Sequence, residues 1–166
     1  DTARLILEAG AAPDQARNAG ATPLFAACYN GHLEIVRLLL EASAAVGQAA
    51  DGGFTPLIVA CEQGHLDCVR LLLEASAAVS QAKDDGATPL NIACQEGQIE
   101  CVRLLLEAGA AVNQAAEDGV TPLYIACQEG HFECAQLLRD AGAAVNQAQA
   151  EGASPLCLAA ANGHLE

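Results

Sequence analysis

The chain contains 166 residues, of which 52% are apolar, 3% are aromatic and 17% are charged, and its formal net charge is −14 at pH 7. This acidic excess argues against nucleic acid and anionic membrane surfaces as partners, because both bind clustered lysine and arginine side chains. No apolar run approaches the roughly 18 residues that a transmembrane helix needs, so the sequence also predicts no membrane partner.

A short motif, Thr-Pro-Leu or Ser-Pro-Leu, recurs along the chain at a spacing of 33 residues. It begins at Thr22, Thr55, Thr88, Thr121 and Ser154. A fixed period in this range is typical of solenoids, so we expect one repeat array over residues 1–166. The array divides into a partial repeat at 1–17, full repeats at 18–50, 51–83, 84–116 and 117–149, and a partial repeat at 150–166. Neither partial repeat has the polar outer face of a solenoid terminus, as expected for a piece of a longer array.

The repeat at 51–83 shows how each unit folds. Thr55 is a good N-cap and Pro56 suits the first helical position, where no N–H is needed. The apolar run at 57–61 predicts a short helix, which Gly64 ends in a left-handed conformation. A second helix begins at 65–66 and runs over 67–74. Helices of about eight residues are unstable alone in water, so each unit depends on stacking against its neighbours.

The order of motifs within each period resembles the ankyrin repeat. The pattern G-x-T-P-L is followed by A-A or A-C, then G-H, then V-x-L-L-L and a small residue, and it covers essentially the whole chain. The resemblance implies an all-α solenoid of stacked helix-turn-helix units joined by β-hairpin-like turns. It also implies that the turns and first helices line a concave groove, which is usually the binding surface.

Two features depart from the family pattern. The aspartate that usually opens the turn is replaced by Arg17, Ala50, Lys83, Ala116 and Gln149, which leaves the hydrogen bonding of the turns open. Ser43 and Ser76 stand where glycine usually ends the second helix. If these serines are left-handed, each costs about 1–2 kcal/mol relative to glycine.

Seven of the eight cysteines fall at two repeat positions, Cys28, Cys61, Cys94 and Cys127 at one and Cys68, Cys101 and Cys134 at the other. Both positions are small apolar slots, where a free thiol packs as a small hydrophobe. We therefore expect free cysteines and an intracellular, reducing compartment, cytoplasmic or nuclear. A zinc site is the alternative, because C-x3-H-x2-C occurs at 61–68 and 127–134. Gln98 and Ile35 interrupt this pattern in other repeats, so we predict no metal.

The remaining polar residues predict no catalysis. His32, His65, His131 and His164 join the two helices of a repeat, and by resemblance they satisfy backbone groups of the loop. None has a serine or cysteine placed for nucleophile activation. The glycines are single and periodic, so they form no phosphate-binding loop. We expect no catalytic residue, no cofactor and no enzymatic activity.

Positions that differ between the repeats are the candidates for recognition. They lie in the first helices and at the turn tips: Phe25, Tyr29, Asp51, Phe54, Ile58, Glu62, Asp84, Asp85, Asn91, Gln95, Glu96, Glu117, Asp118, Tyr124, Gln128 and Glu129. Four of the five aromatic residues belong to this variable set, and aromatic anchors ringed by polar groups are typical of interface hot spots. The alternative is that Phe25 and Tyr124 fill space and that Phe54 covers its own turn.

The sequence is best explained as a non-enzymatic protein-interaction module. Its concave, acidic groove would bind a protein or peptide that carries lysine or arginine, and the chain would be a monomer. Two alternatives stay open at this point. The array could be a structural spacer, or a duplicated or designed scaffold without an evolved partner, or it could be a fragment of a larger enzyme or channel whose chemistry lies elsewhere.

Overall fold

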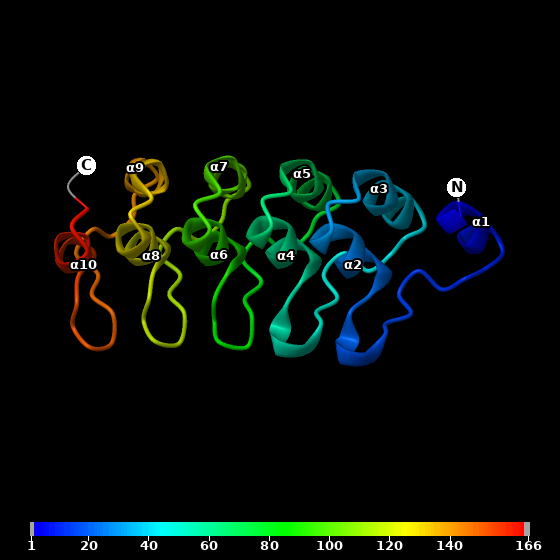
Figure 1. Cartoon of the computed structure of the whole chain (residues 1–166), viewed down its shortest axis with the longest axis horizontal. Coiled ribbons are helices and arrows are strands. Elements are labelled where there is room, and N and C mark those ends of the chain that lie inside the picture. The colour runs from blue at the N-terminus through cyan, green and yellow to red at the C-terminus, as the bar shows by residue number, and fades with distance from the viewer. Residues whose placement is uncertain (1, 165–166) are drawn as a thin grey trace. The chain divides into compact units, whose positions relative to one another are not determined.

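The computed structural model describes residues 2–164, and the chain divides into two compact units, residues 1–78 (unit 1) and residues 79–166 (unit 2). Within the described residues there are ten α-helices, two short 3-10 helices and no strand, which confirms the all-α prediction. In each unit the helices form an inner and an outer layer, and long turns extend from the inner layer (Figure 1).

Unit 1 contains α1 (Thr2–Glu8), η1 (Asn18–Gly20), α2 (Pro23–Tyr29), α3 (Leu33–Glu41), η2 (Asp51–Gly53), α4 (Pro56–Glu62) and α5 (Leu66–Glu74). Unit 2 contains α6 (Pro89–Gln95), α7 (Ile99–Glu107), α8 (Pro122–Glu129), α9 (Phe132–Asp140) and α10 (Pro155–Ala161). We call α2, α4, α6, α8 and α10 the inner helices, and α1, α3, α5, α7 and α9 the outer helices.

Each inner helix begins with the predicted cap. The Thr55 hydroxyl oxygen accepts a hydrogen bond from the Ile58 N–H at 3.2 Å, and Pro56 occupies the first turn. The corresponding threonine or serine does the same in α2, α6, α8 and α10, at 3.1–3.3 Å. Such caps satisfy one of the N–H groups that a helix start leaves without a partner. The cap therefore fixes where each inner helix starts.

Every outer helix among the described residues is followed by a residue with positive φ. In the first, fourth and fifth copies this residue is glycine, at Gly10, Gly109 and Gly142. In the other two it is Ser43 (φ 63°) and Ser76 (φ 65°), so both serines do adopt the left-handed conformation. A side chain in this region is strained because its Cβ approaches the following carbonyl oxygen.

The core of each unit lies between its two layers of helices. In unit 1, α2 packs against α3 and α4, and α5 packs against α3 and α4. In unit 2, α8 packs against α6, α9 and α10, and α7 packs against α6 and α9. Leucine supplies much of the volume, with Leu24, Leu72 and Leu105 fully buried. All eight cysteines are free, and all are buried except the half-buried Cys127 and the exposed Cys157.

Histidines tie neighbouring repeats together within each unit. The Nε2 atom of His65 lies 3.2 Å from the carbonyl oxygen of Tyr29, in the preceding repeat. A carbonyl only accepts, so Nε2 carries the proton. The His65 ring fills the space beside Gly31, where an added Cβ would lie 2.6 Å from the ring. His131 and His164 make the same contacts in unit 2, with Gln95 and Gln128. For His65, His131 and His164, these bonds confirm the structural role that the resemblance implies.

The turns close without the usual opening aspartate. The Lys83 N–H donates to the Ala87 carbonyl at 2.9 Å, and each other turn has an equivalent backbone bond. In unit 2 the side chains of Asp85 and Asp118 also accept from the N–H groups of Ala87 and Val120, both at 3.0 Å. Aspartate two residues into the turn therefore replaces the missing one, because its short side chain reaches the backbone two residues on.

Replacing the left-handed serines by glycine should stabilise the protein. We expect Ser76→Gly to raise the free energy of unfolding by about 0.5–1 kcal/mol, because the strain relieved exceeds the extra chain entropy that glycine brings to the unfolded state. Gly109→Ser is the matched control at the same repeat position. A Cβ at Gly109 meets nothing within 4 Å, so only backbone strain should act, and stability should fall. Urea unfolding followed by circular dichroism measures the free energy of unfolding of both variants and of the wild type. Equal stability of all three proteins would contradict the backbone strain at the left-handed serines.

Candidate functional site

Unit 1 has a groove on the turn side of its inner helices. It has a volume of about 410 Å³ and lies over α2 and α4, which pack against each other. Its lining is Arg17, Phe25, Ala26, Tyr29, Asn30, Phe54, Val59 and Glu62. We call this the unit 1 groove. Three aromatic rings and two small apolar residues make up most of its wall, and charged groups stand at its edge.

Unit 2 has a groove in the same position relative to its own helices. It has a volume of about 280 Å³ and lies over α6 and α8. Its lining is Lys83, Asp85, Ala87, Ile92, Gln95, Ala116, Asp118, Val120, Ile125, Gln128 and Glu129. We call this the unit 2 groove. Isoleucine side chains form its apolar part, and amides and carboxylates surround them.

The two grooves are built from equivalent positions two repeats apart. Arg17 corresponds to Lys83, Tyr29 to Gln95, Phe54 to Val120, Val59 to Ile125, and Glu62 to Gln128. The backbone scaffold is shared, so the grooves differ mainly in their side chains. The unit 1 groove has aromatic rings at positions where the unit 2 groove has an amide or an aliphatic side chain.

The residues directly after each Thr-Pro-Leu motif do not all reach the surface. Ile58 and Asn91 are 0% exposed and Tyr124 is 6% exposed. This corrects the expectation that these three side chains contact a partner, since they offer little or no accessible area. Phe25, at the same repeat position, is half-buried and does line the unit 1 groove.

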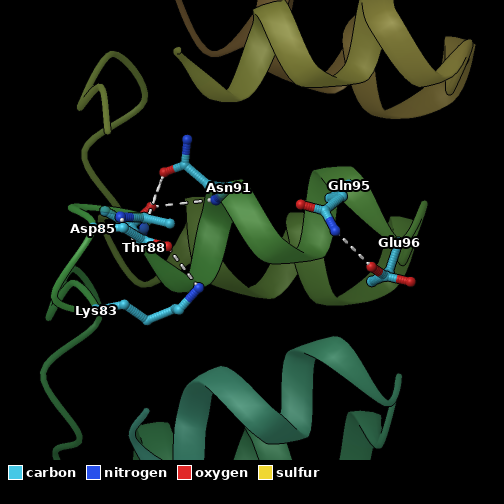
Figure 2. A network of polar contacts seen from close by, with 7 residues as sticks. Lys83, Asp85, Thr88, Asn91, Gln95 and Glu96 are labelled. Atoms are coloured by element: carbon cyan, nitrogen blue, oxygen red, sulfur yellow. Dashed lines mark hydrogen bonds and ion pairs between the residues drawn. The ribbon is translucent and has the colours of Figure 1, made fainter. Parts of the chain in front are cut away.

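Asn91 has a structural role instead. Its Nδ2 donates to the Val120 carbonyl at 3.3 Å, which ties it to the next turn. Its Oδ1 accepts from the Thr88 N–H at 3.1 Å and from the Thr88 hydroxyl. Together with the Asn91 N–H bond to Thr88 Oγ1, these contacts form a capping box at the start of α6 (Figure 2). A buried amide must be hydrogen-bonded, and here it is.

The acidic residues are at the surface but are not all equivalent. Asp51, Asp84 and Glu117 are exposed at turn tips. Asp85 pairs with Lys83 at 2.9 Å, at the turn that leads into α6 (Figure 2). The Lys83 hydrogen bond, helped by the Ala87 N–H, holds the pKa of the Asp85 carboxyl below its ordinary value. Asp118 is exposed and accepts from its own turn.

Two carboxylates at the ends of inner helices are held by neighbouring amides. The Gln95 side chain donates to Glu96 at 3.0 Å, and the Gln128 side chain donates to Glu129 at 2.8 Å. In unit 1 the order is reversed, with Gln63 donating to Glu62 at 3.3 Å. These bonds orient the carboxylates without neutralising them, because an amide carries no charge.

Sequence reasoning missed part of the groove lining. Val59, Ile92 and Ile125 lie in the groove walls, although the sequence presents them only as parts of apolar runs in the first helices. Each stands three residues before a predicted contact, namely Glu62, Gln95 or Gln128. Residues three and four apart share a helix face, so this spacing was the available signal. Arg17 and Lys83 also line the grooves, although the sequence marks them only as replacements for the aspartate that usually opens the turn.

The histidine, cysteine and acidic side chains of residues 2–164 also bear on metal binding and thiol reactivity. No group of three histidine, cysteine, aspartate or glutamate side chains there is placed to hold a metal ion. Burial raises the pKa of the Cys28 thiol, and it raises that of Cys134 to about 11, so both are protonated and unreactive near neutral pH. Within the described part of the chain, no helix is both long and apolar enough to span a membrane.

The fold defines a helical-repeat protein with a surface groove in each unit. The family model described as ankyrin repeats (3 copies) matches residues 1–82, 46–116, 76–149 and 109–166, which together cover the whole chain. The chain therefore belongs to the ankyrin repeat family, whose members are generally protein-interaction modules and typically not enzymes. A comparison with curated proteins finds no match.

The ion pair in the unit 2 groove leads to a test. In Lys83→Met, the pKa of Asp85 should rise, since the hydrogen bond that lowers it most is removed. A carboxyl with a lowered folded pKa favours folding above its unfolded pKa of about 3.9. The stability lost in Lys83→Met should therefore be largest near pH 7 and should shrink as pH falls through the folded pKa.

Carboxyl-detected NMR titration measures the Asp85 pKa directly. Arg103→Met is the control, because Arg103 pairs with Glu100 at 3.4 Å on an outer helix and should leave Asp85 unchanged. An unchanged Asp85 pKa in Lys83→Met would contradict the ion pair in solution.

Proposed function

We propose that this protein binds a protein or peptide through the turn-side grooves of its inner helices, and that the unit 2 groove receives lysine or arginine side chains. The membership of the ankyrin family supports the interaction role in general. The observation that carries the finer proposal is the charge of the unit 2 groove. One lysine there faces three carboxylates, those of Asp85, Asp118 and Glu129.

The lysine does not cancel this charge for an incoming partner. Lys83 is already bonded to Asp85, and its side chain is only 14% exposed, whereas that of Asp85 is 59% exposed. Asp118 and Glu129 are exposed, and among residues 2–164 neither has a cationic partner. A basic side chain would gain charge-assisted hydrogen bonds there and bury its aliphatic stem against the half-buried Ile125.

The scaffold favours binding by a preformed surface. Its turns are closed by backbone bonds, and adjacent turns of unit 2 are joined by a 3.0 Å bond from the Glu117 N–H to the Asp85 carbonyl. A surface fixed in this way loses little conformational entropy when a partner binds. The chain itself supplies no chemistry in this role, and the partner is recognised by the positions of the side chains.

The proposal predicts a local effect of charge. Glu96→Lys with Glu129→Lys should weaken binding of a lysine-rich, unstructured peptide at least tenfold. The pair reverses the charge of Glu129 in the lining of the unit 2 groove and of Glu96 at the same repeat position, directly after α6. The matched control is Glu107→Lys with Glu133→Lys, which changes the net charge equally on the outer helices α7 and α9. We expect this control to weaken binding less than threefold.

Fluorescence anisotropy with the labelled peptide, at low and high salt, measures both affinities. A glutamine-for-lysine version of the peptide shows how much of the binding depends on its charge. Equal weakening by the two pairs would mean that only net charge matters, and would contradict a groove-specific site. Binding that ignores both pairs would favour the role of a spacer or scaffold.

A further inference from the structure

The unit 1 groove differs from the unit 2 groove in a way that charge alone does not describe. Phe25, Tyr29 and Phe54 all line it, and the equivalent positions in unit 2 are Asn91, Gln95 and Val120. Three of the five aromatic residues of the chain therefore face one groove. Two come from α2 and the third comes from the turn that precedes α4.

Each of the three residues is partly exposed to solvent. Tyr29 is 48% exposed, and Phe25 and Phe54 are half-buried. The Phe54 ring lies over its own turn, 3.3 Å from where a Cβ of Gly52 would stand. Ala26 and Val59 are small, so the rings enclose a space of about 410 Å³ instead of filling it. Pockets that hold small ligands begin at about 300 Å³, so a single large side chain can enter.

The charges of this groove cancel. Arg17 and Glu62 are the charged residues of its lining, one of each sign. The position equivalent to Asp85 is Ala19 in this repeat, so the carboxylate that holds Lys83 has no counterpart beside Arg17. Among residues 2–164, Arg17 forms no ion pair. A charged occupant would leave one rim group repelled, whereas a neutral side chain would not.

We propose that the unit 1 groove is an anchor pocket for an uncharged aromatic side chain, phenylalanine or tryptophan in type, from the protein partner. This inference rests on the proposed function and specifies a second subsite for it. An aromatic occupant gains edge-to-face contacts with the rings beyond the burial of its area, which an aliphatic side chain does not. Arg17 and Glu62 then form the polar rim typical of an interface hot spot.

A hydrogen bond between the two repeats that form the pocket fixes its backbone before a partner binds. Tyr29 closes α2, and its carbonyl accepts the 3.2 Å bond from His65, which belongs to the next repeat. The backbone that carries the most exposed ring is thereby fixed to the repeat that carries Phe54 and Val59. Few groups then lose conformational freedom when the aromatic side chain binds, so the entropy cost of binding is small.

The test uses three neutral-backbone probes with the full chain: N-acetyl-phenylalanine amide, N-acetyl-leucine amide and N-acetyl-lysine amide. Two-dimensional 1H–15N NMR reports which residues each probe perturbs. We expect the phenylalanine probe to shift α2, α4 and residues 50–54 with saturation, and to bind at least threefold more tightly than the leucine probe. The lysine probe should not saturate this groove.

The residues of unit 2 at the same repeat positions supply the substitutions for a variant of the unit 1 groove. Tyr29→Gln with Phe54→Val installs the residues that unit 2 carries at the same positions, so the repeat fold should tolerate them. We expect this pair to weaken the phenylalanine probe at least fivefold. Tyr29→Phe keeps the ring and should stay within twofold of wild type. Phe132→Leu is the control for an exposed ring outside the groove, because Phe132 is 49% exposed on the outer helix α9, and it should have no effect.

Several outcomes would overturn the anchor pocket. They are the absence of saturable shifts in unit 1, equal affinity for the leucine probe, and a paired variant that binds like wild type while its spectrum shows an intact fold. The proposed function fails separately, because its peptide assay depends on Glu96 and Glu129 in unit 2. If the lysine-rich peptide binds in a charge-dependent way and the phenylalanine probe does not bind, the proposed function stands and the anchor pocket is rejected. If the probe binds and the peptide does not depend on charge, the pocket stands and the basic-partner proposal is rejected.

Discussion

The structure depends on the need of very short helices to bury an apolar side against a neighbour. The α-helices of residues 2–164 contain seven to nine residues each, which is too short for a stable helix in water. The inner helices start at threonine or serine caps. Inner and outer helices alike are followed by a residue with positive φ, so they do not continue past it. Stability therefore comes from stacking, α2 on α4 in unit 1 and α6 on α8 in unit 2. Stacking buries the apolar faces of the helices. The turn side of the inner layer is not needed for this packing, so its side chains can vary from repeat to repeat.

The same contacts that stabilise the stack also position the grooves. The bond from His65 to the Tyr29 carbonyl joins two repeats at the end of α2, and the bond from Asn91 to the Val120 carbonyl joins α6 to the following turn. In both cases a polar side chain donates a hydrogen bond to a backbone carbonyl of a neighbouring repeat. Tyr29 lines the unit 1 groove and Val120 lines the unit 2 groove, so each groove has a wall residue whose carbonyl is held by a neighbouring repeat. Recognition can then depend on side chains alone, with the backbone unchanged.

The two grooves show how one scaffold supports two chemistries. The unit 1 groove is aromatic with one charge of each sign, and the unit 2 groove is amide-rich with an excess of carboxylates. The apolar parts differ less, since valine and isoleucine occupy equivalent places. A partner that offers an aromatic side chain to one unit and basic side chains to the other would satisfy both grooves.

The sequence by itself determined the repeat, the caps, the left-handed helix ends and the ankyrin family, because each depends on local backbone chemistry that recurs at a fixed spacing. It also placed the acidic turn tips and three of the groove aromatics correctly at the surface. Only the tertiary structure decided which variable positions are accessible. Ile58, Asn91 and Tyr124 are buried whereas Phe25 is not, and this depends on how much space the surrounding side chains leave at an otherwise identical helix position. The replacement of the missing turn aspartate by Asp85 and Asp118 was likewise decided in three dimensions, since it depends on where a side-chain oxygen meets a backbone N–H.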